Sequence, residues 1–282
     1  MTVIVGILCS DGVVIGSDSA MAAGRAFTPT GYTIERQEGD VLKLEIIEKN
    51  VIIAGTGAMG LAQRFNHRVE TTIKELREPF RPSVSGIQGV GFIGSKVQQI
   101  FTGKVEAGTV LYDALKPVEI GTVISEAVIE DFKRTQSTQQ ISNGWGFGAL
   151  FAFVHGDQPH LVDFDPVQFH SELKGQPDPE RGDQDRIWRC VTWGRGQQLG
   201  DAFLAHVYRL LFGKKVEDSN EWIFEAPPKV AKAKVAVAWT VDHVRRYNTG
   251  LVGGKLQLAV LEKRDGVWTA NHQGNLEEIR DR

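Results

Sequence analysis

Thr2 has a side chain well suited to covalent chemistry, at the very start of the chain. A small second residue normally allows the initiator Met1 to be removed, which would leave Thr2 as the amino-terminal residue. An amino-terminal threonine carries a hydroxyl nucleophile beside its own α-amine, and that amine can act as the base. The reference pKa of an α-amine is about 7.7–8, so much of it is neutral at working pH. Threonine is also an ordinary second residue, so support must come from the rest of the chain.

The segment that follows predicts a β-hairpin that returns a carboxylate toward Thr2. Apolar residues occupy both alternating sets of positions in residues 3–9, which is typical of a strand buried on both faces. Asp11-Gly12 favours a two-residue turn, because both residues tolerate positive φ. In that register Val5 faces Asp18. The second strand therefore brings Asp18 to the end of the sheet where the chain begins.

The remaining pattern predicts an α+β fold in which strands and pairs of helices alternate. The predicted helices cover residues 61–78, 119–135, 198–212 and 227–247. The predicted later strands cover residues 40–47, 51–54, 146–155, 161–164, 168–173, 187–193, 255–262 and 267–269. Short consecutive strands are typical of antiparallel sheets, and two such sheets between helix layers give an αββα four-layer sandwich. Without a repeat or linker, residues 1–282 are predicted to form one domain, with surface insertions near 20–39, 83–118 and 174–186.

Composition excludes several classes of protein. The net charge is −3 and no basic stripe with interleaved aromatic residues occurs, so we expect no nucleic-acid partner. No apolar run reaches membrane-spanning length and no signal peptide is evident, which predicts a cytoplasmic protein without a membrane contact. The two cysteines lie in apolar segments and fit buried thiols. The seven histidines are scattered and form no metal motif, so no metal or cofactor is expected.

A glycine-rich turn after the strand at 51–54 has the spacing of a dinucleotide-binding motif. Gly55, Gly57 and Gly60 follow an apolar strand and open a helix, where a pyrophosphate could bind. That motif also needs an acidic residue at the end of a second parallel strand, about 20 positions on. Here the acidic residues at that distance still lie within the predicted helix. We therefore interpret the motif as a tight strand-to-helix turn whose backbone N–H groups could bind an anion.

These residues together resemble a known family. Thr2, the strand that ends in Asp18-Ser19, Lys43, and the turn and helix that begin at Gly57 resemble a β-type proteasome subunit. The spacings match that family apart from extra residues near 20–39. The direct Met-Thr start is similar to the bacterial HslV-type peptidase, whereas the length is more similar to the longer bacterial proteasome homologues (Anbu and the β-proteobacterial homologue). The resemblance is specific over residues 2–78 and architectural beyond.

The resemblance implies an N-terminal-nucleophile hydrolase with four residues in named roles. Thr2 would be the nucleophile and, through its amine, the general base. Lys43 would lie beside the Thr2 hydroxyl and lower its pKa or relay its proton. Asp18 would hold Lys43 charged and oriented, as a carboxylate near a buried cation does. The Gly57 N–H would stabilise the tetrahedral oxyanion.

The resemblance also implies a first specificity pocket. Met21, Val41, Gly55 and Met59 would line it, which predicts a preference for a bulky apolar side chain before the cleaved bond.

Three positions depart from the family where its members support the terminal amine. Arg195-Gly196 replaces a Ser-Gly pair before the third helix. An Asp and a Ser before the paired glycines are matched by Thr249 and Val252, and of these only Thr249 carries a hydroxyl. Nearby Asn248 or Asp242 could substitute, while Arg195 could instead serve a ring contact or a substrate carboxylate.

Three functions stay open at this stage. The leading one is a threonine-type endopeptidase in a homo-oligomeric (double) ring, acting on peptides or unfolded protein. The second is a small-amide hydrolase with the same nucleophile, and the third is a catalytically silent ring or scaffold subunit. Simpler interpretations also exist for single residues: Asp18 as a strand end, Lys43 paired with Glu45, and Gly57 as a turn glycine. The chain has no P-loop, so an ATP-dependent unfoldase would have to be another chain, and its existence is left open.

Overall fold

The computed structural model describes most of the chain. The described residues are 2–28, 31–37, 41–57, 59–80, 108–135, 148–165, 169–172, 190–217, 222–224, 226–248 and 252–273. The expected insertion at 174–186 and most of the one at 83–118 lie outside these ranges, as does Thr249.

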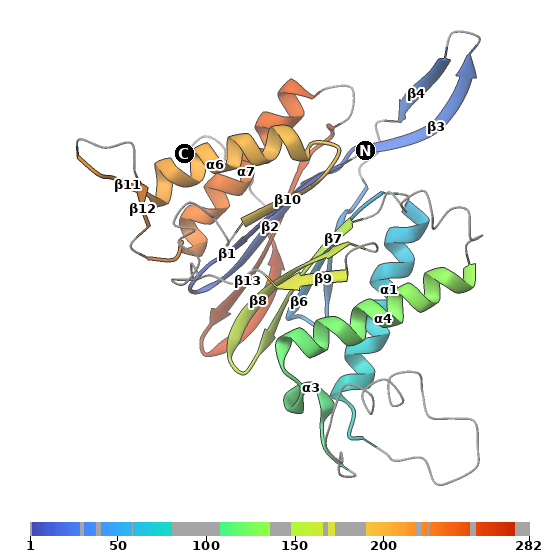
Figure 1. The fold of residues 1–282 in the computed structure, drawn as a ribbon, viewed down its shortest axis with the longest axis vertical. Coiled ribbons are helices and arrows are strands. Elements are labelled where there is room, and N and C mark those ends of the chain that lie inside the picture. Colours follow the sequence, from blue (N-terminus) through green and yellow to red (C-terminus); the bar gives the residue numbers. More distant parts are fainter. Residues whose placement is uncertain are drawn as a thin grey trace.

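Two five-stranded antiparallel sheets form the centre of the molecule (Figure 1). The first sheet has the strand order β10 (Cys190–Gly194), β1 (Val3–Leu8), β2 (Gly12–Asp18), β13 (Leu256–Arg264) and β14 (Val267–His272). The second has the order β5 (Leu44–Ile47), β6 (Val51–Thr56), β7 (Gly148–His155), β8 (Gln158–Asp165) and β9 (Phe169–Glu172).

Helices cover the outer face of each sheet (Figure 1). Helices α6 (Gln197–Phe212) and α7 (Val230–Tyr247) pack on the first sheet and share a core cluster with it. Helices α1 (Met59–Arg77) and α4 (Pro117–Thr135) pack on the second sheet in a separate cluster. A third cluster fills the space between the sheets. The expected αββα four-layer arrangement is confirmed.

Strand β1 is an inner strand of the first sheet, between β10 and β2, and its sequence explains why it is buried. Val3, Val5 and Ile7 face the helices α6 and α7, whereas Ile4 and Leu8 face the second sheet. All six residues of β1 are buried. Alternation of two apolar faces therefore positions Thr2, the residue before β1, at the end of a strand held on both sides.

The predicted register of the first hairpin is wrong by two residues. Val5 lies opposite Gly16 instead of Asp18, and the Cys9 N–H donates to the Gly12 carbonyl at 2.8 Å, so the two turn residues are Ser10 and Asp11 instead of Asp11 and Gly12. The physical reason is a long-range contact: the Asp11 carboxylate accepts a hydrogen bond of 2.9 Å from the N–H of Val230, which begins α7. Asp11 is therefore engaged by a helix N-terminus. The corrected register carries Asp18 closer to the start of the chain.

The region near 20–39 was expected to be a loop and instead contains a hairpin. Strands β3 (Met21–Thr28) and β4 (Gly31–Gln37) form a separate two-stranded sheet that extends beyond the two main sheets (Figure 1). The expected strand at 40–47 is shorter, because β5 begins only at Leu44. The sequence of residues 20–39 favoured a loop over strands, because this region contains glycines and Pro29.

Three short elements were also not predicted. They are α3 (Leu111–Ala114), β11 (Lys214–Lys215) and β12 (Trp222–Ile223). Segments of two to four residues are too short to show a periodicity.

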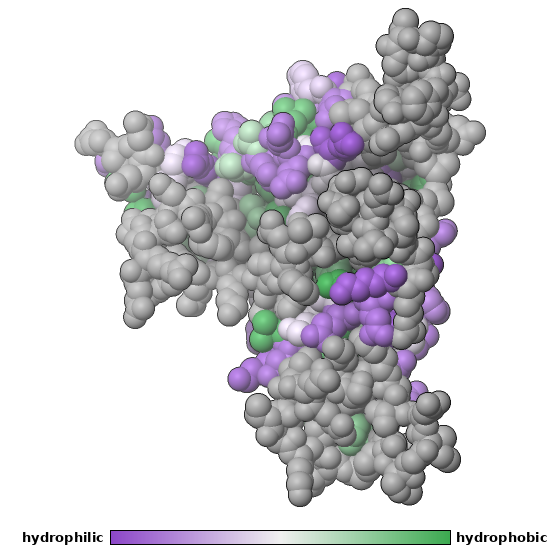
Figure 2. Space-filling view, turned by 45° about the vertical axis from the view of Figure 1, so that its right-hand side comes forward, coloured by the Kyte–Doolittle hydropathy of each residue, from purple (hydrophilic) through white to green (hydrophobic). Residues whose placement is uncertain are grey.

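The described surface carries no large apolar area on the face drawn in Figure 2, where apolar residues form small patches between hydrophilic ones. The large apolar side chains that are exposed are spread over different parts of the described chain. They are Leu42, Val118, Leu210, Ile223, Tyr247 and Val267. Scattered residues of this kind are common on folded proteins. In the described part of the chain, no helix combines the length and the apolar character needed to cross a membrane.

Candidate active site

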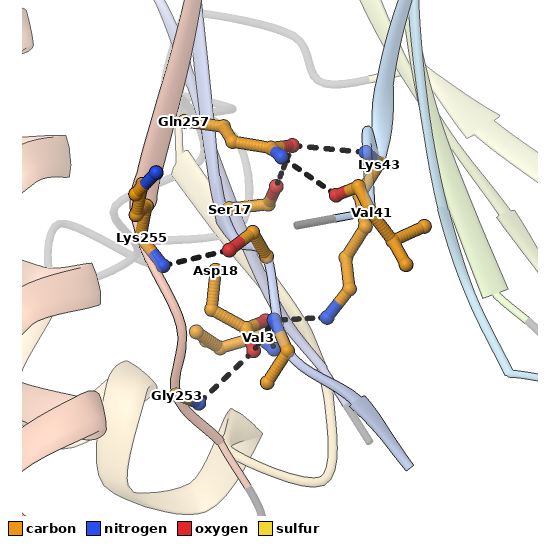
Figure 3. Close-up of polar contacts among 10 residues, drawn as sticks. Val3, Ser17, Asp18, Val41, Lys43, Gly253, Lys255 and Gln257 are labelled. Atoms are coloured by element: carbon orange, nitrogen blue, oxygen red, sulfur yellow. Dashed lines mark hydrogen bonds and ion pairs between the residues drawn. The ribbon is translucent and has the colours of Figure 1, made fainter. Parts of the chain in front are cut away.

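The Asp18 carboxylate forms a dense set of hydrogen bonds near the start of the chain. This fully buried carboxylate accepts four hydrogen bonds, two on each oxygen (Figure 3). Oδ1 accepts from the Val3 N–H and from Lys43 Nζ, each at 2.9 Å. Oδ2 accepts from the N–H groups of Ala20 at 3.2 Å and Gly253 at 3.1 Å. These donors come from four separate segments, so the carboxylate is held in one position.

Lys43 forms a buried ion pair with Asp18. The side chain of Lys43 is 9% exposed and that of Asp18 is 0% exposed. Burial lowers the pKa of Lys43 from its ordinary value, and the charge and hydrogen bond of Asp18 oppose that shift in part. Lys43 therefore releases its proton more readily than an exposed lysine does. The structure pairs the Lys43 ammonium with Asp18, where the sequence had left a pairing with Glu45 open.

Thr2 adjoins this ion pair through the backbone. The Val3 N–H that binds Asp18 belongs to the peptide bond that joins Thr2 to Val3. Since Lys43 Nζ binds the same carboxylate oxygen, the ammonium lies beside this first peptide. Thr2 itself is 4% exposed. The structure thus brings three of the four expected catalytic residues into one small region.

The turn after β10 closes tightly around the Thr2 carbonyl. Gly194 has a φ of 98°, and a Cβ on it would lie 2.1 Å from the Thr2 carbonyl oxygen. The Gly196 N–H donates a long hydrogen bond of 3.5 Å to the same oxygen. Only glycine permits so close an approach at Gly194, because any side chain would occupy the space of the carbonyl.

Gly57 lies at the matching end of the second sheet. It follows β6, is exposed and has a φ of 111°, a conformation that favours glycine. The preceding residue, Thr56, is buried, and its Oγ1 would stand 3.1 Å from a Cβ on Gly194. The end of β6 therefore meets the turn that holds Thr2. Gly57 is one residue from this meeting point.

The expected specificity pocket is only partly described. Gly55 lies in β6 opposite Ala149, and Val41 lies before β5, where its N–H donates 3.3 Å to the Ser19 carbonyl. The side chains of Met21 and Met59 lie outside the described residues. The pocket and its preference remain predictions.

The structure shows where two of the residues that depart from the family pattern, Arg195 and Val252, lie relative to Thr2. Arg195 is exposed, and the contact of this turn with Thr2 comes from the Gly196 backbone instead. Val252 is fully buried, and a Cβ on Gly196 would lie 3.3 Å from its Cγ2. At this position an apolar side chain packs close to the start of β1.

The proposed substitutes for the missing polar groups are partly described. Asp242 pairs with Arg246 at 2.7 Å, so its carboxylate is occupied on helix α7. Asn248 caps that helix, and its carbonyl accepts the Val252 N–H at 2.9 Å. Thr249 lies outside the described residues.

Two residues near the site were not identified from the sequence, Thr56 and Gln257. Thr56 alternates with Ile52 and Ala54 toward the space between the sheets, so its inward face was readable once β6 was assigned. Gln257 is the one polar residue in the apolar run 256–261 of β13. A lone polar residue in an apolar strand indicates a specific contact, since a buried polar side chain needs a hydrogen-bond partner.

The glycine motif is not part of a dinucleotide site. Strand β6 pairs antiparallel with both β5 and β7, whereas the dinucleotide motif requires a parallel sheet.

Comparison with solved structures identifies the fold. The chain is similar to an Anbu mutant from Hyphomicrobium sp. strain MC1, with a TM-score of 0.58 and 13% sequence identity. The match covers 100% of this chain and 92% of that chain. No protein-family model matches the sequence, and no curated protein does. The likeness therefore concerns the fold, and this chain has the proteasome-type αββα fold of Anbu.

Proposed function

We propose that this protein is a threonine-type peptidase whose nucleophile is Thr2, exposed when Met1 is removed. The observation that carries this proposal is the buried Asp18–Lys43 pair, bonded through one carboxylate oxygen to the backbone beside Thr2. Burying two charges costs several kcal/mol per ion, so structural stability alone is a weak reason to keep such a pair. A buried lysine of lowered pKa beside a hydroxyl nucleophile is an arrangement suited to proton transfer.

The reaction follows from these groups. The Thr2 hydroxyl attacks the substrate carbonyl carbon while its proton passes to the α-amine, directly or through Lys43. The Gly57 N–H donates to the oxyanion of the tetrahedral intermediate. Collapse of the intermediate breaks the C–N bond, and the leaving amine takes the proton. Water then hydrolyses the ester on Thr2, with the α-amine again acting as the base.

The fold likeness supports assembly of this chain into a homo-oligomeric ring that encloses the sites. We propose a peptide or unfolded protein as the substrate and the cytoplasm as the compartment.

A second candidate, a silent ring or scaffold subunit, is favoured by one specific observation. Buried Val252 and exposed Arg195 stand at positions where the resemblance implies polar groups around the terminal amine. An amine without such partners would be a poorer base, because nothing orients its lone pair toward the hydroxyl.

The deciding experiment begins with the intact mass of the purified protein. Loss of one Met exposes the Thr2 amine, and the protein is then incubated with a peptide epoxyketone. This probe bonds to both the hydroxyl and the amine of an amino-terminal threonine, so the protein gains the full probe mass. The proposal expects that gain on Thr2, a loss of the gain in Thr2→Ala, and a strong reduction in Lys43→Met.

The matched control is Lys263→Met. Lys263 also pairs with an aspartate, Asp157 at 2.7 Å, but both side chains are exposed. It should react as the parent does. Retention of Met1 in every molecule, or no adduct on a protein that has lost Met1, would favour the scaffold.

A further inference from the structure

The segment that carries Lys43 needs support from outside its own sheet. Residues 41–43 precede β5 and belong to no described strand. One backbone contact, from the Val41 N–H to the Ser19 carbonyl at 3.3 Å, ties its beginning to the end of β2. A lysine on such a segment would be free to shift unless something else fixed its backbone.

Gln257 supplies two further bonds to this segment (Figure 3). Its Oε1 accepts the Lys43 N–H at 2.9 Å, and its Nε2 donates to the Val41 carbonyl at 2.6 Å. The Ser17 hydroxyl also donates to Oε1, at 3.4 Å. The side-chain amide thus bonds the backbone on both sides of residue 42, as a neighbouring strand would.

The chemistry of these partners requires a primary amide. A backbone N–H can only donate and a carbonyl can only accept, so the side chain must offer an acceptor and a donor together. Glutamate lacks the donor, and methionine of similar length lacks both. The backbone partners also fix which end of the amide is oxygen.

Gln257 lies in the same short segment that supports the other member of the ion pair. The Gly253 N–H binds Asp18, and the Lys255 N–H binds the Ser19 hydroxyl at 2.6 Å. Alternate residues from Gly253 to Gln257, which lead into β13, therefore contact Asp18, Ser19 and the segment 41–43. Figure 3 shows the Gln257 bonds above the Asp18–Lys43 pair and the Gly253 bond below it.

We propose that Gln257 is a positioning residue that sets the Lys43 ammonium against Asp18 by bonding the backbone of residues 41 and 43. Its effect on the position of Lys43 stands on the contacts alone. Its effect on the reaction rests on the proposed function.

The first test measures the reactivity and the pKa of the Lys43 amine, and it does not depend on peptidase activity. Competitive acetylation with mass spectrometry, over a series of pH values, gives the labelling rate and pKa of the Lys43 amine in the full chain. In Gln257→Met the segment should loosen and admit water, so the labelling rate should rise several-fold and the pKa should move up toward its ordinary value. Gln273→Met is the matched control, because Gln273 Oε1 accepts a part-buried hydrogen bond of 3.0 Å from Lys234, a contact that involves neither Asp18 nor Lys43.

Thermal unfolding of each variant separates a local effect from loss of the fold. If Gln257→Met does not fold, Gln257→Glu keeps the length and an acceptor while losing the donor to Val41. The labelling rate of Lys43 should rise in this variant too, and that rate is the readout because the added carboxylate would itself raise the pKa of Lys43. A Lys43 profile that matches the parent in a folded Gln257 variant overturns the proposal.

The second test applies to the reaction with the peptide epoxyketone. Gln257→Met should lower the rate of adduct formation by roughly 10- to 100-fold, as a small misplacement of a catalytic group does. In a Lys43→Met background the same change should have no further effect, since its action passes through Lys43. Equal losses in both backgrounds would assign Gln257 a merely structural role.

These tests distinguish the two proposals. A parent protein that forms no adduct, with a Lys43 profile that still shifts in Gln257→Met, contradicts the peptidase and keeps the positioning role.

Discussion

Gly194 approaches Thr2 so closely that a Cβ on it would lie 2.1 Å from the Thr2 carbonyl oxygen. Contact at that distance is impossible, so a side chain there must displace the first peptide of β1 or the turn after β10. The position of the proposed nucleophile therefore depends on the absence of a single methyl group on the neighbouring strand.

Gly194→Ala should move Thr2 and abolish its reaction with the epoxyketone. It should also lower the free energy of unfolding beyond the roughly 1–2 kcal/mol that positive φ costs an alanine. Gly266→Ala is the control, because Gly266 has a φ of 80° with nothing within 4 Å of its Cβ position. Urea unfolding of both variants isolates the cost of the contact. Equal losses of stability would show that the Thr2 carbonyl can yield.

Asp18→Asn should remove the charge that faces Lys43 and turn one acceptor into a donor. The amide NH₂ would then oppose two of the four donors that now converge on the carboxylate. Breaking a buried pair typically costs about 3–5 kcal/mol, and we expect a loss of that order in chemical denaturation. Asp157→Asn, in the exposed pair with Lys263, should leave the unfolding free energy nearly unchanged.

The stability of the protein should rise with pH in the alkaline range because of Lys43. Burial lowers the pKa of Lys43 in the folded chain below the ordinary value of 10.5. Between the two values the unfolded chain binds more protons than the folded chain, so the free energy of unfolding increases as pH rises. Urea midpoints over this interval should show that increase in the parent and lose it in Lys43→Met. An unchanged slope in Lys43→Met would mean that other groups cause it.

Gly57→Ala tests the proposed oxyanion donor. Alanine disfavours the φ of 111°, so the peptide should rotate and its N–H should turn away from the intermediate. Loss of one such donor lowers kcat by about 10²–10³-fold, and we expect a drop of that order with little change in KM. Peptide hydrolysis under steady-state conditions measures both constants. Gly266→Ala again controls for backbone strain, and a parent-like kcat in Gly57→Ala would assign the oxyanion to another donor.

Local patterns predicted those parts of the fold that depend on neighbouring residues. The two apolar faces of residues 3–8 and the helix predicted at 61–78 correspond to β1 and α1. The register of the first hairpin was mispredicted, since Asp11 binds the N-terminus of a helix more than two hundred residues away in sequence. A turn motif read alone carries no information about such a partner.

The same limit applies to the candidate site. Asp18 was identified from the predicted hairpin and Lys43 from the family resemblance, and the structure places them in contact. Gln257 and Thr56 were missed, because their importance depends on which strands meet across the sandwich. Sequence periodicity shows that a strand is buried, but not which residue of another sheet lies opposite its end.

The convergence of hydrogen-bond donors on Asp18 determines when, during translation, the candidate site can become complete. The first hairpin can form soon after it leaves the ribosome, but one donor to Asp18 belongs to Gly253, and the backbone of Lys43 is held by Gln257. Both belong to the last part of the described chain to be synthesised. An unfinished chain therefore holds no complete version of the candidate site, and the proposed peptidase activity would begin only after translation has passed Gln257.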